Sequence, residues 1–196
     1  LYQYASSLLS MQASKYYMTE FSGEWAHEVN MTEQELSFGK KMVDTKLGSR
    51  AGMLCSPFFL VSLNDKAKEN SGDVLFGTLA WTGNFRFTFE VDNHNKLRIL
   101  SGINPYASEY TLKPGEVFAT PEFIFTYSTE GKGKASRDFH DWARKYQLKN
   151  GEGPRMSLLN NWEATYFGFD EAKLKELFGE AAHLGVDMFL LDDGWF

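Results

Sequence analysis

The most informative segment of this chain is Met188-Phe189-Leu190-Leu191-Asp192-Asp193-Gly194-Trp195-Phe196. Four apolar residues in succession are typical of a strand that is buried on both faces of a parallel sheet. Two carboxylates and a tryptophan follow at the carboxyl end of this strand, which is the end where α/β folds bind their ligands. Carboxylates accept hydrogen bonds from sugar hydroxyls, and an aromatic plane suits the C–H face of a sugar ring. The segment therefore predicts a sugar-binding site at the edge of a parallel sheet.

The sequence that leads into this segment alternates between strand and helix patterns. We predict a strand over residues 156–160, a helix over 170–184 and a strand over 187–192. Asp170 is placed to cap the helix at its start, and Gly185 is placed to end it. Short connections between these elements predict two adjacent parallel strands with a right-handed crossover. Both strands then end on the same side, so that Trp162 lies beside Asp192.

The first two thirds of the sequence have the period of β-strands instead. Residues from about Ser22 to Tyr127 are predicted to be β throughout, and the strictest alternation is Phe85-Arg86-Phe87-Thr88-Phe89-Glu90-Val91-Asp92. This alternation puts four apolar side chains on one face of a strand. Further strands are expected at residues 53–63, 74–81, 97–103 and 117–127, with turn clusters between them. Strands at this spacing predict an antiparallel sandwich.

Ser136 marks the expected change from the β period to the helical period. It can cap a helix whose apolar residues are spaced by three and four, whereas residues 131–134 are expected to form a turn. The predicted division is a β-sandwich over residues 1–135, a linking helix and linker over 136–154, and a first βαβ unit over 155–196. The fold class is then an all-β antiparallel sandwich followed by the start of a (β/α)8 TIM barrel, because a single parallel pair leaves faces and edges uncovered.

Composition excludes several classes of function. The net charge of −6 argues against a nucleic acid partner. No apolar run is long enough to span a membrane, so no membrane partner is expected. A single cysteine, Cys55, excludes a disulfide within the chain and suggests a reducing compartment. The cytoplasm is the expected location, and the periplasm stays open as an alternative. Apolar neighbours indicate that Cys55 is a buried thiol and not a nucleophile.

Neither a metal nor a cofactor is expected. The four histidines lack the spacing of metal ligands; they are His27, His94, His140 and His183. The glycine- and lysine-rich segment 131–134 lacks the spacing of a phosphate-binding loop, and the chain contains no Gly-x-Ser-x-Gly nucleophile motif.

Several motifs in this order resemble glycoside hydrolase family thirty-six, the α-galactosidases also called melibiases. The barrel motifs are Asn161-Trp162-Glu163-Ala164 with Tyr166-Phe167, and Leu190-Leu191-Asp192-Asp193-Gly194-Trp195-Phe196. The sandwich motifs are Gly23-Glu24-Trp25 with Glu28, Gly102-Ile103-Asn104-Pro105, and Pro114-Gly115-Glu116-Val117-Phe118-Ala119-Thr120-Pro121-Glu122 leading to Tyr127-Ser128. The similarity thus extends along most of the chain.

This resemblance implies a retaining hydrolase that releases terminal α-galactosyl residues from oligosaccharides. The family's nucleophile and acid/base lie on later barrel strands, so the resemblance implies an internal fragment that contains no catalytic residue and is inactive. Asp192 and Asp193 match the aspartates that hold the 4- and 6-hydroxyls of galactose, and Trp162 matches a tryptophan of the galactose pocket. Trp195 is a further candidate for substrate binding, while Glu163 could either orient its neighbours or form a salt bridge. The full-length enzyme is expected to be a homo-oligomer, and the fragment is expected to self-associate through its unfinished parallel sheet.

Other functions remain open at this stage. A galactosyl transferase of the raffinose-synthase type resembles the same barrel. A non-catalytic carbohydrate-binding module would bind glycans through residues 1–135 alone, and a structural or oligomerisation module would bind no sugar. Neither module explains the predicted βαβ unit.

Overall fold

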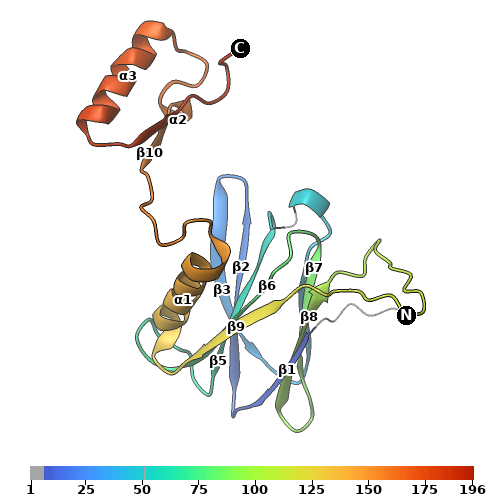
Figure 1. Cartoon of the computed structure of the whole chain (residues 1–196). Coiled ribbons are helices and arrows are strands. Elements are labelled where there is room, and N and C mark those ends of the chain that lie inside the picture. The colour runs from blue at the N-terminus through green and yellow to red at the C-terminus, as the bar shows by residue number, and fades with distance from the viewer. Residues whose placement is uncertain (1–6, 51) are drawn as a thin grey trace. The chain divides into compact units, whose positions relative to one another are not determined.

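The computed structural model describes residues 7–50 and 52–196, which divide into two compact units. The first unit ends at Ala143, and the second runs from Arg144 to Phe196 (Figure 1).

The first unit contains two antiparallel sheets, as the sequence predicted. Sheet A has the order β1-β8-β7-β4, formed by β1 (Ser7–Gln12), β8 (Lys96–Ile103), β7 (Phe85–Val91) and β4 (Gly39–Asp44). Sheet B has the order β3-β2-β5-β6-β9, formed by β3 (His27–Leu36), β2 (Tyr16–Glu24), β5 (Cys55–Leu63), β6 (Asp73–Leu79) and β9 (Phe123–Ser128). Together they form a sandwich.

The hydrophobic core lies between the two sheets and draws heavily on β7. Phe85, Phe87, Phe89 and Val91 are all buried, which confirms the face that the alternating pattern predicted. From sheet B the core receives Tyr16, Met18, Phe59, Val61, Leu75 and Leu79. The aromatic content of the chain therefore serves, in large part, to fill the space between the sheets.

The β region begins earlier than the sequence predicted. β1 and the first part of β2 lie before Ser22. In β2, Tyr16 and Met18 enter the core between the sheets. Phe21 packs on the outer face of sheet B, against a second buried cluster that includes Leu60 and Val74. Because both faces of β2 are partly covered, apolar residues occur on both, and the period-2 signal is weakened.

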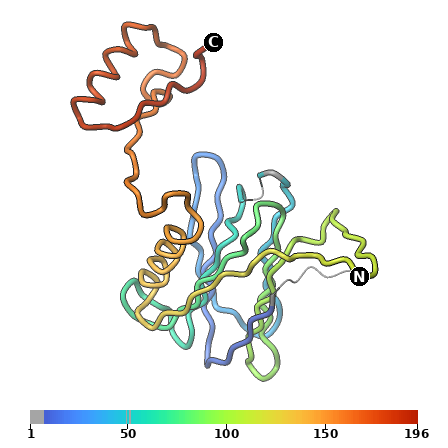
Figure 2. The backbone as a smooth tube through the Cα atoms, in the orientation of Figure 1, coloured from blue at the N-terminus to red at the C-terminus, as the bar shows by residue number. Residues whose placement is uncertain are grey.

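The strand predicted at residues 117–127 is shorter than expected. β9 begins only at Phe123, and residues 104–122 run out from the sheets and back without a strand (Figure 2). Pro114 and Pro121 interrupt this segment, and a proline cannot donate a backbone hydrogen bond to a neighbouring strand.

The helix predicted to start at Ser136 starts at Gly131, so the turn predicted over residues 131–134 is wrong. Helix α1 (Gly131–Trp142) continues into a π-helical turn at Ala143–Gln147. Its first N–H groups donate to remote backbone carbonyls: Gly131 to Gly72, Lys132 to Lys68 and Gly133 to Glu69. These carbonyls satisfy the helix start in place of a side-chain cap.

Helix α1 packs on the outer face of sheet B and is not a free linker. The rings of Phe139 in α1 and Phe76 in β6 are 4.3 Å apart. Ala135 is fully buried, together with Leu60 and Val74 of the sheet. The Lys132 ammonium also pairs with the Glu33 carboxylate of β3 at 2.6 Å.

The second unit contains the predicted strand, helix and strand. Strands β10 (Leu158–Asn160) and β11 (Met188–Leu190) pair in parallel, and helices α2 (Trp162–Thr165) and α3 (Glu171–His183) lie between them in sequence. Asp170 caps α3, as predicted, by accepting a hydrogen bond from the Lys173 N–H at 2.9 Å.

The end of α3 is also as predicted. Gly185 has a φ of 81°, and its N–H donates to Ala182, while Val186 donates to Ala181. This pattern is a Schellman motif, which favours glycine at the left-handed position.

Cys55 lies at the start of β5 and is half-buried. Its Sγ is 3.2 Å from the Asp44 carbonyl oxygen, and burial raises the pKa of the thiol to about 11. The thiolate form is therefore scarce at neutral pH, and Cys55 is a poor nucleophile. Its neighbours Leu54 and Phe58 are exposed, so they do not provide the burial that the sequence suggested.

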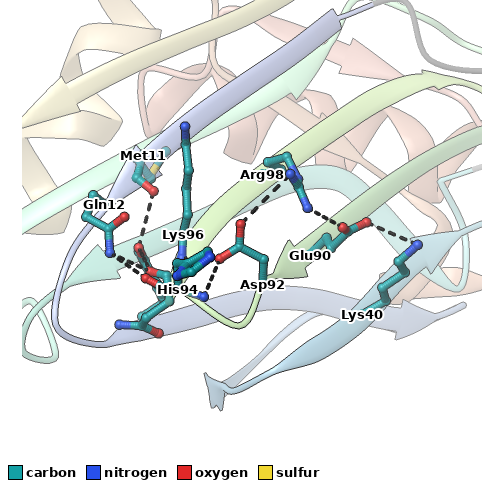
Figure 3. Close-up of polar contacts among 10 residues, drawn as sticks. Met11, Gln12, Lys40, Glu90, Asp92, His94, Lys96 and Arg98 are labelled. Carbon is teal, nitrogen blue, oxygen red and sulfur yellow. Dashed lines mark hydrogen bonds and ion pairs between the residues drawn. The ribbon is translucent and has the colours of Figure 1, made fainter.

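A line of paired charges crosses the outer face of sheet A (Figure 3). Glu90 accepts from Lys40 at 3.1 Å and from Arg98 at 2.5 Å, and the bond from Lys40 is the main reason that the pKa of Glu90 is lowered. The Asp92 carboxylate accepts from the backbone N–H groups of Lys96 and His94, both at 2.9 Å. The bond from the Lys96 N–H is the largest cause of the lowered pKa of Asp92.

Gly131 offers a direct test of how α1 is positioned. A Cβ at this residue would lie 2.4 Å from the Lys68 carbonyl oxygen, and its φ of +84° is unfavourable for alanine. We expect Gly131→Ala to lower the free energy of unfolding of the first unit by at least about 2 kcal/mol in urea denaturation. Gly52→Ala is the control, because no atom lies within 4 Å of the position that a Cβ would take there; we expect a change within about 0.5 kcal/mol. Equal effects at the two glycines would contradict this account.

The charge line of sheet A predicts a pH dependence. Because the folded state lowers the pKa of Glu90 and Asp92, their stabilisation is fully present above the unfolded pKa values of about 4 and is lost as the pH falls through the lowered values. In low-salt urea titrations we expect the double variant Glu90→Gln/Asp92→Asn to be less stable than wild type at pH 6, with the difference shrinking toward pH 3. Glu109→Gln, at an exposed carboxylate between β8 and β9, is the control. A difference that is constant over this range would exclude the mechanism.

Candidate functional site

The carboxyl ends of β10 and β11 lie side by side and are joined by Asn160. This residue pairs with Leu190 in the parallel register. Its Nδ2 donates to the Asp192 carboxylate at 2.5 Å, and its Oδ1 accepts from the Trp162 N–H at 2.8 Å. One amide side chain therefore fixes the starts of both segments that follow the strands. No pattern in the sequence indicated this role of Asn160.

The neighbouring Asn161 holds the backbone of the same site. Its side chain is 1% exposed, and its Oδ1 accepts from the Asp192 N–H at 2.8 Å. Its Nδ2 donates to the Thr165 hydroxyl at 3.0 Å, and its own N–H donates to the Leu190 carbonyl. Asn161 thus ties the first turn of α2 to the end of β11.

The two aspartates differ in their surroundings. Asp192 is half-buried, and its carboxylate accepts from Asn160 and from the Asp193 N–H. Asp193 is exposed, and its carboxylate accepts from the Gly194 N–H at 2.9 Å. Gly194 turns the chain with a φ of +91°, and a Cβ there would lie 2.9 Å from the Phe167 ring. A glycine is thus required where the chain leaves the strand.

Trp162 begins helix α2 and belongs to a small aromatic cluster. Its ring makes edge-to-face contacts with Tyr166 at 5.3 Å and with Phe167 at 5.0 Å. Tyr166 in turn donates from its hydroxyl to the Glu163 carboxylate at 3.2 Å. Trp162 is only partly buried, so part of the indole can contact a ligand. Glu163 orients Tyr166, and no salt bridge to Glu163 is found in the described part of the chain.

Trp195 is 72% exposed and lies against helix α3. It lines a shallow hollow of about 320 Å³ together with Phe169, Asp170, Glu171, Leu174, Lys175, Phe178 and Leu191. Its ring is 5.8 Å from that of Phe196. The contacts that Asn160 makes join Trp162 to Asp192, and Trp195 lies outside this set.

A second hollow, in the first unit, surrounds the turn between β2 and β3. It measures about 560 Å³ and is lined by Gly23, Glu24, Trp25, Glu28, Val29, Arg50, Gly52, Met53 and Ser56. Trp25 is 81% exposed at this turn. Gly23-Glu24-Trp25 was recognised in the sequence only as a family motif, because a single tryptophan in a turn carries no periodic signal.

Two other kinds of feature are absent from the described residues. Within residues 7–50 and 52–196, no group of three or more His, Cys, Asp or Glu side chains is arranged to hold a metal. Over the same residues, no helix combines the length and the hydropathy that crossing a membrane requires.

The side chains at the two strand ends have the chemistry to bind a ligand that carries several hydroxyl groups. Carboxylates accept strong hydrogen bonds from hydroxyls, and a half-exposed indole offers an apolar face. In (β/α) barrels the carboxyl ends of the strands are where the active site lies, which is where these residues are found.

Comparison with known proteins gives the family. The model "Glycosyl hydrolase family 36 N-terminal domain" matches residues 1–113, and the model "Melibiase" matches residues 117–196. The chain belongs to glycosyl hydrolase family 36, as its motifs suggested.

Individual members of the family are similar to this chain along almost its whole length. Alpha-galactosidase 2 of Pediococcus pentosaceus is 35% identical over 98% of this chain and 26% of its own length. The solved α-galactosidase of Lactobacillus brevis matches with a TM-score of 0.86 at 34% identity, over 98% of this chain and 26% of that structure. The solved α-galactosidase AgaA of Geobacillus stearothermophilus matches with a TM-score of 0.87 at 32% identity, over 98% of this chain and 27% of that structure. The chain therefore spans about a quarter of the length of these relatives.

Asn161 offers a test of how the strand ends are held. In Asn161→Ala the N–H of Asp192 loses its acceptor, which costs about 1–3 kcal/mol for a group removed from water. We expect faster amide hydrogen exchange at Asp192 and along β11. Glu176→Ala, at an exposed position of α3, is the control and should leave exchange in β11 unchanged. Unchanged exchange in Asn161→Ala would show that the side chain does not hold this strand end.

Proposed function

We propose that this chain is part of a retaining α-galactosidase that hydrolyses terminal α-galactosyl residues from oligosaccharides. Membership of family 36 supports this proposal, as do relatives named α-galactosidases at 32–36% identity. Structures of AgaA variants in complex with stachyose and with raffinose indicate the class of substrate. The observation that carries the proposal is the joining of Asp192, Asp193 and Trp162 at neighbouring strand ends through Asn160.

Each of these residues has a role in the proposal. Asp192 and Asp193 accept hydrogen bonds from adjacent sugar hydroxyls, which a rigid strand end can present at fixed spacing. Trp162 packs against the apolar face of the galactose ring. Trp195, which is largely exposed but lies outside the contacts that Asn160 makes, is a further residue that we propose to contact the substrate. A site whose carboxylates pair with an axial hydroxyl discriminates against sugars that lack this hydroxyl.

The two aspartates bind substrate but do not form the catalytic pair. Retaining hydrolysis requires a nucleophile and an acid/base about 5–5.5 Å apart that flank the scissile bond. Asp192 and Asp193 leave a single strand end, and each accepts the N–H of the residue that follows it. From one strand end they can clamp neighbouring hydroxyls but cannot straddle a glycosidic bond. The catalytic pair therefore lies outside these residues, and the chain alone is inactive.

The same proposal includes the organisation of the longer enzyme. Residues 1–135 form the C-terminal part of a larger sandwich, residues 136–154 lead to the barrel, and residues 155–196 form the first βαβ unit of a (β/α)8 barrel. The relatives, which are about four times as long, support a larger enzyme. We further propose that the full-length enzyme is a homo-oligomer in the cytoplasm; the one cysteine of this chain, which forms no disulfide within it, supports a reducing compartment.

The test compares two substrates in the full-length enzyme that carries this chain. Asp192→Ala or Asp193→Ala removes a charge-assisted hydrogen bond worth about 1.5–3 kcal/mol. We expect kcat/KM for an aryl α-galactoside to fall roughly 10- to 150-fold. With the 4-deoxygalactoside the loss should shrink for the aspartate that binds the 4-hydroxyl, because the missing hydroxyl leaves that carboxylate without a partner. Substitution of either aspartate by Asn should lower kcat/KM less than substitution by Ala if hydrogen-bond acceptance matters more than charge.

Asp187→Asn is the matched control at the opposite end of β11. Asp187 accepts from the N–H and the hydroxyl of Ser157 at 2.8 and 2.9 Å and stabilises the strand pair. This variant should lower stability but leave the ratio of galactoside to deoxygalactoside rates unchanged. An unchanged ratio in both Asp192 and Asp193 variants would end the proposal that these residues bind the sugar.

A further inference from the structure

The side-chain amide of Asn160 lies between a group that only donates hydrogen bonds and a group that accepts them. Its Oδ1 accepts from the Trp162 N–H at 2.8 Å, and its Nδ2 donates to the Asp192 Oδ2 at 2.5 Å. A backbone N–H cannot accept and an ionised carboxylate cannot donate, so these two neighbours fix which end of the amide points to each. The order of donor and acceptor therefore fits an ionised carboxylate at Asp192.

Few side chains can replace an asparagine between these two neighbours. Leucine has the same branched shape but neither a donor nor an acceptor. An ionised aspartate has the same shape and only acceptors, so it would turn a negative charge toward the Asp192 carboxylate. The protonated form of an aspartate alone reproduces the amide, because its carbonyl oxygen accepts while its hydroxyl donates.

The Asp192 carboxylate is held at both of its oxygens. Asn160 donates to Oδ2, and the Asp193 N–H donates to Oδ1 at 2.8 Å. The Asp192 backbone is fixed separately, since its N–H donates to the Asn161 side chain at 2.8 Å. Asn161 thus holds the main chain at this position, whereas Asn160 holds the carboxylate itself. The lone pairs that remain for a ligand consequently point in fixed directions.

Trp162 is held at both of its backbone groups. Its N–H begins helix α2 and finds its acceptor in the Asn160 side chain, and its carbonyl accepts from the Tyr166 N–H at 2.7 Å. Tyr166 has a φ of 47° and a ψ of −127°, a strained conformation for a residue with a side chain. Such a conformation persists only where the surroundings impose it. The Tyr166 ring then contacts the Trp162 indole at 5.3 Å.

We infer that Asn160 is a positioning residue of the sugar site, which sets the Asp192 carboxylate and the Trp162 indole in one fixed arrangement. The inference rests on the proposed function, in which these two residues bind galactose. A sugar can place a hydroxyl on the carboxylate and its C–H face on the indole at the same time only if the two groups are correctly spaced. Asn160 controls this spacing because it bonds directly to both residues, and it acts through them without contacting the sugar.

The first test is a double-mutant cycle in the full-length enzyme that carries this chain, with an aryl α-galactoside as substrate. Asn160→Leu keeps the shape of the side chain and removes both of its hydrogen bonds. We expect kcat/KM to fall roughly 10-fold or more, because a hydrogen bond to a charged group is lost. In the Asp192→Ala background the fall should be at least about threefold smaller, because the carboxylate that Asn160 holds is already gone. A purely structural role predicts the same fall in both backgrounds.

The second test is the pH dependence of Asn160→Asp. Two carboxyl groups in contact share one proton, which they release at a higher pH than a single carboxyl group does. While this proton is present, the introduced group donates to Asp192 as the amide does; once it is lost, the two carboxylates repel each other. We expect kcat/KM, divided by the wild-type value at the same pH, to fall at least about fivefold between about pH 5 and pH 8. The neighbouring carboxylates Asp193 and Glu163 are the same in both enzymes, so their titration cancels in this ratio.

Ser157→Ala is the matched control at the other end of the same two strands. The Ser157 hydroxyl donates to the Asp187 carboxylate at 2.9 Å, so its loss should lower the unfolding temperature but leave kcat/KM within about twofold of wild type. A fall in kcat/KM as large as that of Asn160→Leu would assign the effect to strand stability and overturn the inference.

The outcomes separate this inference from the proposed function. If Asp192→Ala impairs the enzyme but Asn160→Leu acts equally in both backgrounds, or if the ratio for Asn160→Asp is constant with pH, the inference is overturned and the proposed function stands. If Asp192→Ala leaves kcat/KM unchanged, the role of Asp192 in the proposed function fails, and the inference fails with it.

Discussion

The sandwich depends on the packing of one side chain, Phe59, between the two sheets. Its ring makes edge-to-face contacts with Phe87 at 5.1 Å and Phe89 at 4.9 Å, and so joins β5 to β7. Gly77 on the neighbouring strand is required for this arrangement, because a Cβ there would lie 2.5 Å from the Phe59 ring. Fully buried aromatic rings provide much of the free energy that holds a sandwich together. The alternation in β7 therefore places Phe87 and Phe89 on the face that meets Phe59.

The second unit is organised by different forces. Its described residues form a parallel pair of short strands, the one-turn helix α2 and the longer helix α3, whose only buried residue is Ala181, so little apolar area is buried within the unit. Hydrogen bonds at both ends of the strand pair compensate: Ser157 and Asp187 at the amino end, Asn160 and Asn161 at the carboxyl end. The candidate site is consequently held by polar contacts between the ends of the two strands.

The sequence predicted those features that periodicity or local turn chemistry controls. The face of β7, the cap of α3 by Asp170 and the stop at Gly185 all follow from patterns within a few residues. The parallel pairing of β10 and β11 follows from the order of strand, helix and strand with short connections. Features that depend on remote backbone were missed. The start of α1 depends on carbonyls of residues 68–72, and the early strand β2 is covered on both faces, which weakens its alternation.

The same limit applies to the candidate site. The positions of Asp192, Asp193 and Trp162 after predicted strands placed them at one edge of the sheet, and the structure has them there. The roles of Asn160 and Asn161 could not be predicted, because an amide side chain has no periodic signature and its partners lie 32 and 31 residues away. A pattern can identify the residues at a strand end, but only the paired strand shows what holds them.

The two aspartates also differ in the capacity that remains for a ligand. An ionised carboxylate can accept about four hydrogen bonds. Asp192 already accepts from Asn160 through one oxygen and from the Asp193 N–H through the other, and it is half-buried. Asp193 accepts from the Gly194 N–H through one oxygen and is exposed, so its second oxygen lies open to solvent. Asp192 is thus the more rigid of the two and fixes the position of the strand end, whereas Asp193 has the greater unused capacity to bind a hydroxylated ligand.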